Sequence, residues 1–158
     1  MKRFKTILLI SLSFNSFTQG FNEDKTALTN FVIRMYKAKP FEGVKIIDDY
    51  DHSYLLSVLS LETKKYTSET IMTRVAEVKS QSQANRFFNG SIIEMDMIIK
   101  TNETKNTDGT SESTVNMIEK IKENSMGFVQ GMEQMANFQI NNGERTLFIY
   151  YRKMTIEE

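Results

Sequence analysis

Apolar residues recur at helical spacing directly after residue 24. The recurring positions follow i, i+3, i+4, i+7 and i+8, which is the stripe of an amphipathic helix; they are Leu28, Phe31, Val32, Met35 and Tyr36. Asp24 can cap this helix at its amino end. The pattern predicts that the helix ends at Lys39, because Pro40 forces the preceding residue out of helical geometry.

A strand hairpin is predicted next. Residues 44–48 and 54–61 are rich in β-branched and aliphatic side chains, and residues 49–53 (Asp-Tyr-Asp-His-Ser) have the composition of a turn. The second strand is apolar on both faces, with Leu55, Leu59 and Leu61 on one and Tyr54, Leu56 and Val58 on the other. We therefore expect it to be a central strand, or one covered on both sides.

The middle of the chain predicts a second helix followed by a third strand. The helix should begin at Thr67 or Ser68 and reach about Phe88, with a stop at Asn89-Gly90. One of its faces carries Ile71, Val75, Val78 and Ser82. Residues 91–100 then alternate strictly, as a half-buried strand does, with one face formed by Ile93, Met95, Met97 and Ile99.

The last third predicts a loop, a helical segment and a second hairpin. Residues 101–113 have no large apolar side chain and read as a loop. Helical spacing then links Ile118, Ile121, Ser125, Phe128, Met132 and Met135. Gly127 and Gly131 weaken this pattern, so it fits two helices or one bent helix. Residues 138–140 and 144–152 flank a turn, Asn-Asn-Gly, at 141–143.

These elements follow the order α-ββ-α-β-α-ββ. That order predicts an α+β fold, in which a mostly antiparallel sheet of about five strands carries two or three packed helices. We expect residues 21–40 to form an amino-terminal helix and residues 41–158 a single α+β domain.

Residues 1–20 have the layout of a secretory signal peptide. Lys2, Arg3 and Lys5 precede a short apolar stretch, and small residues follow it, so we predict cleavage between Thr18 and Phe21. The apolar stretch is about 13 Å long as a helix, well short of a bilayer core of about 30 Å. We expect export to the periplasm or the extracellular space, without membrane insertion after cleavage. The absence of cysteine excludes a lipoprotein.

Charge and composition narrow the function classes. The 158 residues include 20 basic and 20 acidic side chains. Removing the three basic residues of the leader leaves 17 against 20, or −3, which offers no basic surface for nucleic acid. The chain has no cysteine and a single histidine, His52, which excludes disulfides, thiolate metal sites and multi-histidine metal centres.

Several polar or sulfur-containing clusters have both a functional and a structural interpretation. Asp48, Asp49 and Asp51 beside His52 could bind calcium, but the twelve-residue calcium-loop pattern is missing and a turn explains them. Two methionine pairs could bind copper(I), although both fall on apolar faces, where methionine fills core gaps; the pairs are Met95 with Met97 and Met132 with Met135.

Neither of two further features predicts catalysis. Glu94 and Asp96 share one strand face and could act as an acid–base pair, but Lys100 on the same face indicates a solvated surface. The stripe from Ile118 to Met135, with Gly127-x-x-x-Gly131, could bind a partner helix or pack on the chain's own sheet. No nucleophile motif or phosphate loop is present, so we predict no catalytic, cofactor-binding or metal-binding residue.

One block of the chain resembles a known family. It comprises the strand at 54–61, the helix RVAEVKSQSQANRFFNG at 74–90, the strand that follows to residue 101, and SMGFVQGMEQMANFQINNGERTLFIYYRK at 125–153. Ala76, Ser80, Ala84 and Phe88 match a helix of small residues ending in a glycine, here Gly90, and Gly131 matches a second glycine before a hairpin. The block resembles the small outer-membrane lipoprotein family related to the amino-terminal domain of the flagellar ring protein FlgT.

The resemblance implies an envelope-associated structural or assembly module without catalysis, and it assigns no site residues. This chain departs from that family in having no lipid-bearing cysteine. We therefore expect an exported, non-enzymatic interaction domain whose partner is an unknown envelope protein, with no cofactor. A small ligand- or metal-binding envelope protein is the alternative, and an enzyme comes third.

Overall fold

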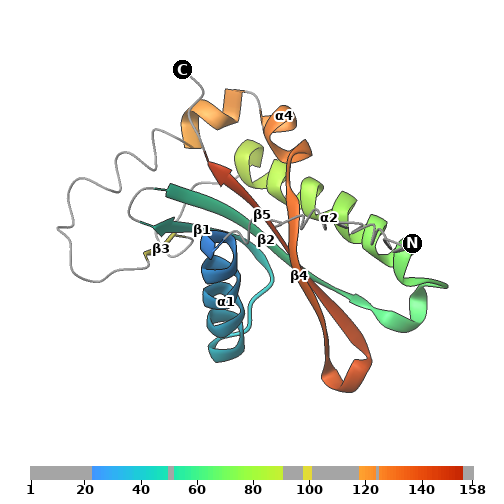
Figure 1. Ribbon diagram of the computed structural model, residues 1–158. Coiled ribbons are helices and arrows are strands. Elements are labelled where there is room, and N and C mark those ends of the chain that lie inside the picture. Colours follow the sequence, from blue (N-terminus) through green and yellow to red (C-terminus); the bar gives the residue numbers. More distant parts are fainter. Residues whose placement is uncertain (1–22, 50–51, 91–97, 101–117, 124, 155–158) are drawn as a thin grey trace, which may run out of the picture.

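A computed structural model describes residues 23–49, 52–90, 98–100, 118–123 and 125–154. The described residues form one five-stranded sheet, with the order β3-β1-β2-β5-β4, and helices on both of its faces (Figure 1). The elements are α1 (Glu23–Ala38), β1 (Gly43–Asp49), β2 (His52–Glu62), a 3-10 turn η1 (Thr63–Lys65), α2 (Glu69–Gly90), β3 (Ile98–Lys100), α4 (Ser125–Gln130), β4 (Glu133–Ile140), a 3-10 turn η3 (Asn141–Gly143) and β5 (Arg145–Met154).

Three of the four strand pairs are antiparallel. β1 pairs with β2, β4 pairs with β5, and the two hairpins are joined through a long pairing of β2 with β5, from Ser53 opposite Met154 to Glu62 opposite Arg145. β3 pairs with β1 in the parallel direction. The predicted α+β class with a mostly antiparallel sheet is confirmed. Of the predicted third strand, residues 91–97 lie outside the described residues, as do the predicted leader and the loop at 101–113.

Helix α1 is the amphipathic helix that the spacing predicted. Leu28, Val32 and Tyr36 are buried, while Phe31 and Met35 are half-buried beside them. The helix ends at Ala38, two residues before the proline. Its start differs from the prediction, because α1 already includes Glu23, so that Asp24 lies within the helix rather than capping it.

The β1–β2 hairpin has a shorter connection than predicted. Asp49 pairs with His52, and Asp48 pairs with Ser53, so these four residues belong to the strands. The predicted turn at 49–53 was therefore too long, because local turn composition also suits the ends of an antiparallel ladder. β2 lies between β1 and β5 and is buried along nearly its whole length, which confirms the prediction of a central strand.

Helix α2 has the predicted bounds but buries a different face. The Ser68 hydroxyl accepts a hydrogen bond from the backbone N–H of Ile71 at 3.3 Å, which places Ser68 at the cap. Of the predicted face, Val75 is half-buried against the core, but Ile71 and Val78 are 48% and 66% exposed and Ser82 is exposed, so the face as a whole was wrong. The buried face consists of Met72, Ala76, Ser80, Ala84, Phe87 and Phe88. Small side chains allow this helix to lie close against the sheet.

The predicted helical stripe from Ile118 to Met135 ends earlier than expected. Residues 118–123 and 125–130 are helical, and the backbone N–H of Gly131 donates to the Phe128 carbonyl at 3.1 Å as α4 ends. Ile118, Ile121, Ser125, Phe128 and Met132 are all buried. Met135 instead belongs to β4 and packs on the other face of the sheet. The helix ends at Gln130 although the apolar spacing continues to Met135, because the chain enters strand β4 at Glu133.

The β4–β5 hairpin turns at the predicted glycine. Asn141, Asn142 and Gly143 have φ values of 51°, 54° and 87°. These left-handed conformations are ones that asparagine and glycine tolerate best, which explains the Asn-Asn-Gly sequence at this turn.

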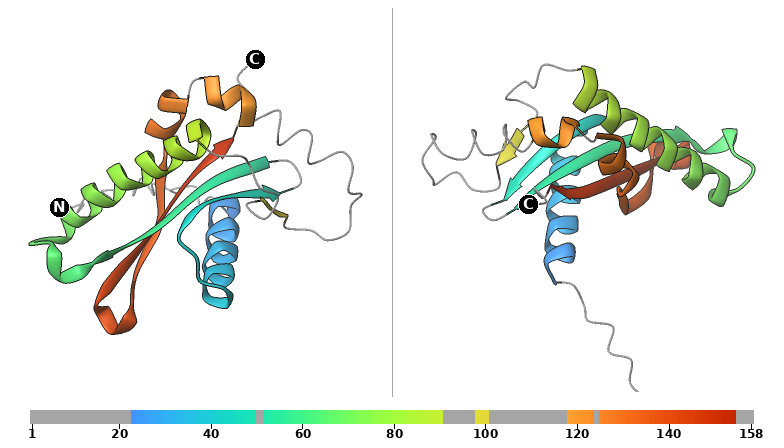
Figure 2. Two further views of the ribbon diagram at one scale, coloured as in Figure 1. Left: turned by 180° about the vertical axis from the view of Figure 1, so that it is seen from behind. Right: turned by 90° about the horizontal axis from the view of Figure 1, so that it is seen from above.

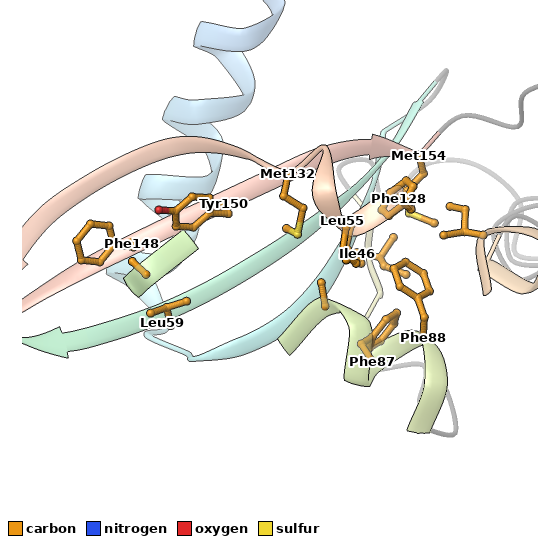
Figure 3. Close-up of a cluster of buried hydrophobic side chains, with 14 of the residues drawn as sticks. Ile46, Leu55, Leu59, Phe87, Phe88, Phe128, Met132, Phe148, Tyr150 and Met154 are labelled. Carbon is orange, nitrogen blue, oxygen red and sulfur yellow. The ribbon is translucent and has the colours of Figure 1, made fainter. Parts of the chain in front are cut away.

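The core consists of two clusters separated by the sheet, as the opposite placement of α1 and α2 in Figure 2 shows. The cluster on the α2 face contains Phe87, Phe88 and Phe128, with ring centroids 5.4 Å apart in both neighbouring pairs (Figure 3). The cluster on the α1 face contains Leu56, Val58, Leu147 and Ile149 under the helix.

Candidate interaction surface

Three residues of the acidic cluster in the first hairpin, Asp48, Asp49 and His52, belong to the ends of strands β1 and β2. The Ser53 hydroxyl donates to Asp48 at 3.2 Å, and Asp49 lies opposite His52 in the ladder. Asp51 lies outside the described residues. Within the part of the chain that the structure describes, no group of three or more His, Asp or Glu side chains is placed to hold a metal ion.

The structure separates the second methionine pair. Met132 is buried on the α2 face, with its sulfur 3.9 Å from the Ser80 hydroxyl. Met135 packs on the α1 face, across the sheet from Met132. The two thioethers therefore do not converge on one ligand site, and each fills a gap in its own core cluster. Met95, Met97, Glu94 and Asp96 lie outside the described residues.

The helical stripe packs on the protein itself. Phe128 and Met132 belong to the same buried cluster as Phe88 from α2, which favours self-packing over a partner-binding seam for this stripe. The Arg152 guanidinium group lies 4.6 Å above the Phe128 ring and donates to the carbonyls of Gly127 and Phe128 at the end of α4. A Cβ at Gly131 would overlap this guanidinium group, so any side chain there would require Arg152 to shift.

A polar network closes the sheet end beside η1. Arg145 donates to the Ser60 hydroxyl at 2.8 Å and to the Ser60 carbonyl at 3.0 Å, and the same hydroxyl is bonded to Glu42. Lys65 forms an ion pair with Glu62 at 2.9 Å, which lowers the pKa of that carboxyl. Each charged group of this network has a partner, and the network joins β2 to β5.

A second network joins α1 to β4. The Lys25 ammonium group lies 3.0 Å from a Glu133 carboxylate oxygen and 5.3 Å from the centroid of the Tyr151 ring. The Tyr151 hydroxyl donates to the same Glu133 oxygen at 3.3 Å. The hydrogen bond from Lys25 lowers the pKa of Glu133, and Glu133 raises the pKa of Lys25.

Tyr150 is the most strongly perturbed titratable group among the described residues. Burial raises its pKa to about 12, and its hydroxyl donates to the Thr73 carbonyl at 3.2 Å, within reach of the Gln134 amide oxygen at 3.5 Å. A tyrosine that is held neutral and hydrogen-bonded to a backbone carbonyl ties α2 to β5.

A cavity of about 230 Å³ lies between the start of α2 and the β4–β5 hairpin. Its lining combines polar and apolar surface and comprises Thr63, Tyr66, Ser68, Glu69, Met72, Asn137, Phe138, Gln139 and Thr146. Pockets for whole small-molecule ligands usually measure about 300–1,000 Å³. This cavity therefore suits a single side chain or a few water molecules better than a complete organic ligand.

Strand β4 lies at one edge of the sheet and pairs with β5 alone among the described strands. A bulge interrupts the ladder between Gln134 and Ala136, and residues 136–140 then pair regularly. Those five residues (Ala-Asn-Phe-Gln-Ile) carry no charge and no proline. Proteins commonly protect edge strands with lysine, proline or bulges, so this stretch has the features of a strand that can accept another strand.

The two faces of this edge differ in chemistry. Phe138 lies opposite Leu147 and is half-buried on the α1 face, with its ring 5.9 Å from that of Tyr36. Ile140 is half-buried on the same face. Asn137 and Gln139 are exposed and face the α2 side, where they line the cavity. We call residues Ala136–Ile140 the β4 edge.

The sequence did not point to the β4 edge. The helical spacing extends to Met135 and hides the start of this strand, and the position of a strand at the edge of a sheet depends on non-local pairing. The alternation of apolar and carboxamide side chains from Ala136 to Ile140 is the one signal that could have found it.

Comparison of the chain with protein-family models, with curated proteins and with solved structures found no match. None of the helices in the described residues is long and apolar enough to span a membrane.

Proposed function

We propose that this chain is an exported, non-enzymatic interaction domain of the bacterial cell envelope, and that it binds another protein chain through the β4 edge. The observation that carries the proposal is the uncharged edge strand, whose side chains Phe138 and Ile140 are only half covered. Unpaired backbone groups next to apolar side chains are what a strand-adding partner recognises: hydrogen bonds supply affinity, and alternate side chains supply specificity.

The layout of residues 1–20 and the resemblance to the FlgT-related family support the envelope location. The small residues that carry the resemblance, Ala76, Ser80 and Ala84, are ones that α2 buries against the sheet. A pattern kept for packing is consistent with a shared fold, and a module of that family acts by assembly rather than by catalysis.

Export is tested by expressing the whole chain in a Gram-negative host and fractionating the cells. We expect the protein in the periplasm, with a mature amino terminus between Thr18 and Phe21 by mass spectrometry. Recovery of the uncleaved chain from the membrane fraction would contradict this part of the proposal.

Partner binding is tested by site-specific photo-crosslinking in living cells. A photoreactive phenylalanine analogue at Gln139 should give a discrete adduct, because this exposed position borders the strand edge. The same analogue at Ser82, exposed on α2, is the matched control and should give none. Equal labelling at both positions, or no adduct at Gln139, would contradict the β4 edge as the binding surface.

The second candidate function is a small ligand- or metal-binding envelope protein, because the cavity of about 230 Å³ beside α2 has room for a ligand of a few atoms. Its test is native mass spectrometry and metal analysis of the purified chain. A bound molecule that is lost in a Gln139→Leu variant would assign the cavity to a ligand.

A further inference from the structure

We propose that the β4 edge binds a second copy of this chain, so that two sheets join edge to edge into one continuous antiparallel sheet. The inference rests on the proposed function and names its partner. It depends on three properties of the β4 edge: its chemical self-complementarity, the incomplete cover of its apolar side chains, and the symmetry of antiparallel pairing.

Antiparallel pairing of two identical strands creates a twofold axis perpendicular to the sheet. The operation keeps each face of the sheet on its own side, so the α1 faces of the two copies lie on the same side of the joined sheet. With the axis through Phe138, Ala136 lies opposite the second copy's Ile140, and Asn137 lies opposite the second copy's Gln139. Apolar residues then meet apolar residues, and carboxamides meet carboxamides.

Charge favours this occupant. Residues 136–140 are uncharged, so no like charges face each other across the twofold axis, although like charges directly opposite destabilise strand pairs. The charged residue at the start of the strand, Glu133, already pairs with Lys25 of its own chain. Asparagine and glutamine side chains donate and accept hydrogen bonds, and therefore pair with themselves as well as with each other.

The incomplete cover on the α1 face supplies the apolar contribution. Met135, Phe138 and Ile140 are half-buried at the rim of a core cluster that ends at β4. A strand from a second copy would lie about 4.8 Å from β4 and would bring its own Phe138 and Ile140 against this rim. The two core clusters would then join across the twofold axis.

Sedimentation equilibrium of the purified chain, whose amino terminus is first determined by mass spectrometry, tests this association. Between about 1 μM and about 1 mM, we expect a reversible monomer–dimer equilibrium. The variant Asn137→Lys/Gln139→Lys places lysines opposite lysines at two exposed positions, and should weaken dimerisation about tenfold or more. The charge-matched control Thr70→Lys/Ser82→Lys, on exposed positions of α2, should dimerise as the parent does.

Cysteine cross-linking tests the geometry without relying on weakened binding. The chain contains no cysteine, so any disulfide of a single-cysteine variant joins two chains. Opposed residues of antiparallel strands lie within the Cα distance that a disulfide spans. An oxidised mixture of the single variants Asn137→Cys and Gln139→Cys should form a covalent dimer, and Ser82→Cys should remain monomeric.

A chain that stays monomeric to about 1 mM would overturn the inference. So would a dimer that persists unchanged in the double-lysine variant while that variant melts like the parent, because the contact would then lie elsewhere. A monomeric chain that still gives a Gln139-specific adduct with a different protein would refute the second copy and leave the proposed function standing.

Discussion

Helices α1 and α2 cover opposite faces of the sheet in different ways. On the α2 face, Ala76, Ser80 and Ala84 are completely buried, so a helix of small side chains lies directly on the strands. On the α1 face, the buried helical residues are larger, namely Leu28, Val32 and Tyr36. Among the residues that the structure describes, three half-buried apolar side chains border the α2 cluster and eight border the α1 cluster.

This difference indicates that the α2 face contributes more to stability, whereas the α1 face leaves apolar surface for binding. A face closed by small residues and interlocking phenylalanine rings leaves little apolar surface at its margin. A face covered by one helix on large side chains leaves a rim, and the rim reaches the edge strand β4. The comparison predicts that substitutions on the α2 face cost more stability than equivalent ones on the α1 face.

The largest effect is expected from Phe88→Ala. Phe88 is 2% exposed, and its ring lies 5.4 Å from those of Phe87 and Phe128 in edge-to-face geometry. Removing it should lower the free energy of unfolding by about 3–5 kcal/mol, since the cavity cannot collapse between two helices and a sheet. Urea denaturation monitored by circular dichroism measures this loss. A loss below about 1 kcal/mol would show that the α2 face is loosely packed.

Leu28→Ala is the corresponding truncation on the α1 face. Leu28 is 8% exposed and adjoins the half-buried rim, so neighbouring side chains and solvent can partly fill the space. We expect a loss of about 2 kcal/mol, the low end for buried leucine. The same denaturation experiment applies. A loss equal to that of Phe88→Ala would remove the distinction between the two faces.

Ala76→Leu tests the close packing of α2 against the sheet by adding side-chain atoms instead of removing them. Ala76 is completely buried, so three added carbons have no space, and overpacking should cost about 1–3 kcal/mol. Ala27→Leu on the exposed side of α1 is the matched control, and its effect should stay within about 0.5 kcal/mol. Equal melting temperatures for the two variants would contradict close packing of α2.

The α1 face was predictable from sequence because its stripe consists of large apolar residues at helical spacing. The α2 face was not, since periodicity gives weight to large side chains such as Ile71 and Val78, which are exposed, and ignores the alanines that are buried. The hydrophobic pattern identifies the buried face of a helix that packs through large apolar side chains. It misassigns the buried face of a helix that packs through small ones. A second limitation explains why α4 ends before Met135: the apolar spacing continues, but the chain from Glu133 pairs with β5 as strand β4, and a local pattern cannot show that pairing.

The β4 edge was not predictable for a different reason. Strand pairing joins residues distant in sequence, such as Glu62 with Arg145, so a local pattern cannot show which strand lies at an edge. The strand order places β4 there. Only this edge position shows that the alternating residues 136–140 are available to another strand.

The smallest expected effect comes from the ion pair between Lys25 of α1 and Glu133 of β4. It sharpens the comparison because α2 is held to the sheet by close packing and by neutral hydrogen bonds, such as the one from Tyr150 to the Thr73 carbonyl. Glu133→Gln should lower the free energy of unfolding at pH 7 by less than about 1 kcal/mol, because the Lys25 and Glu133 side chains are 41% and 64% exposed.

The pH dependence separates this ion pair from other surface charges. The pKa of Glu133 is lowered below its usual 4.5 by Lys25, so the native state stabilises the ionised carboxylate. That stabilisation is present above pH 4.5 and disappears as the pH falls through the lowered pKa, because the unfolded chain takes up its proton first. The variant should therefore lose less stability than the parent between pH 5 and pH 3, as urea titrations at each pH would measure, and added salt should narrow the difference. Glu119→Gln, which makes the same charge change beside Lys122 at 3.8 Å, is the control. If both variants reduce the loss of stability between pH 5 and pH 3 equally, the change in net charge is responsible rather than the ion pair between α1 and β4.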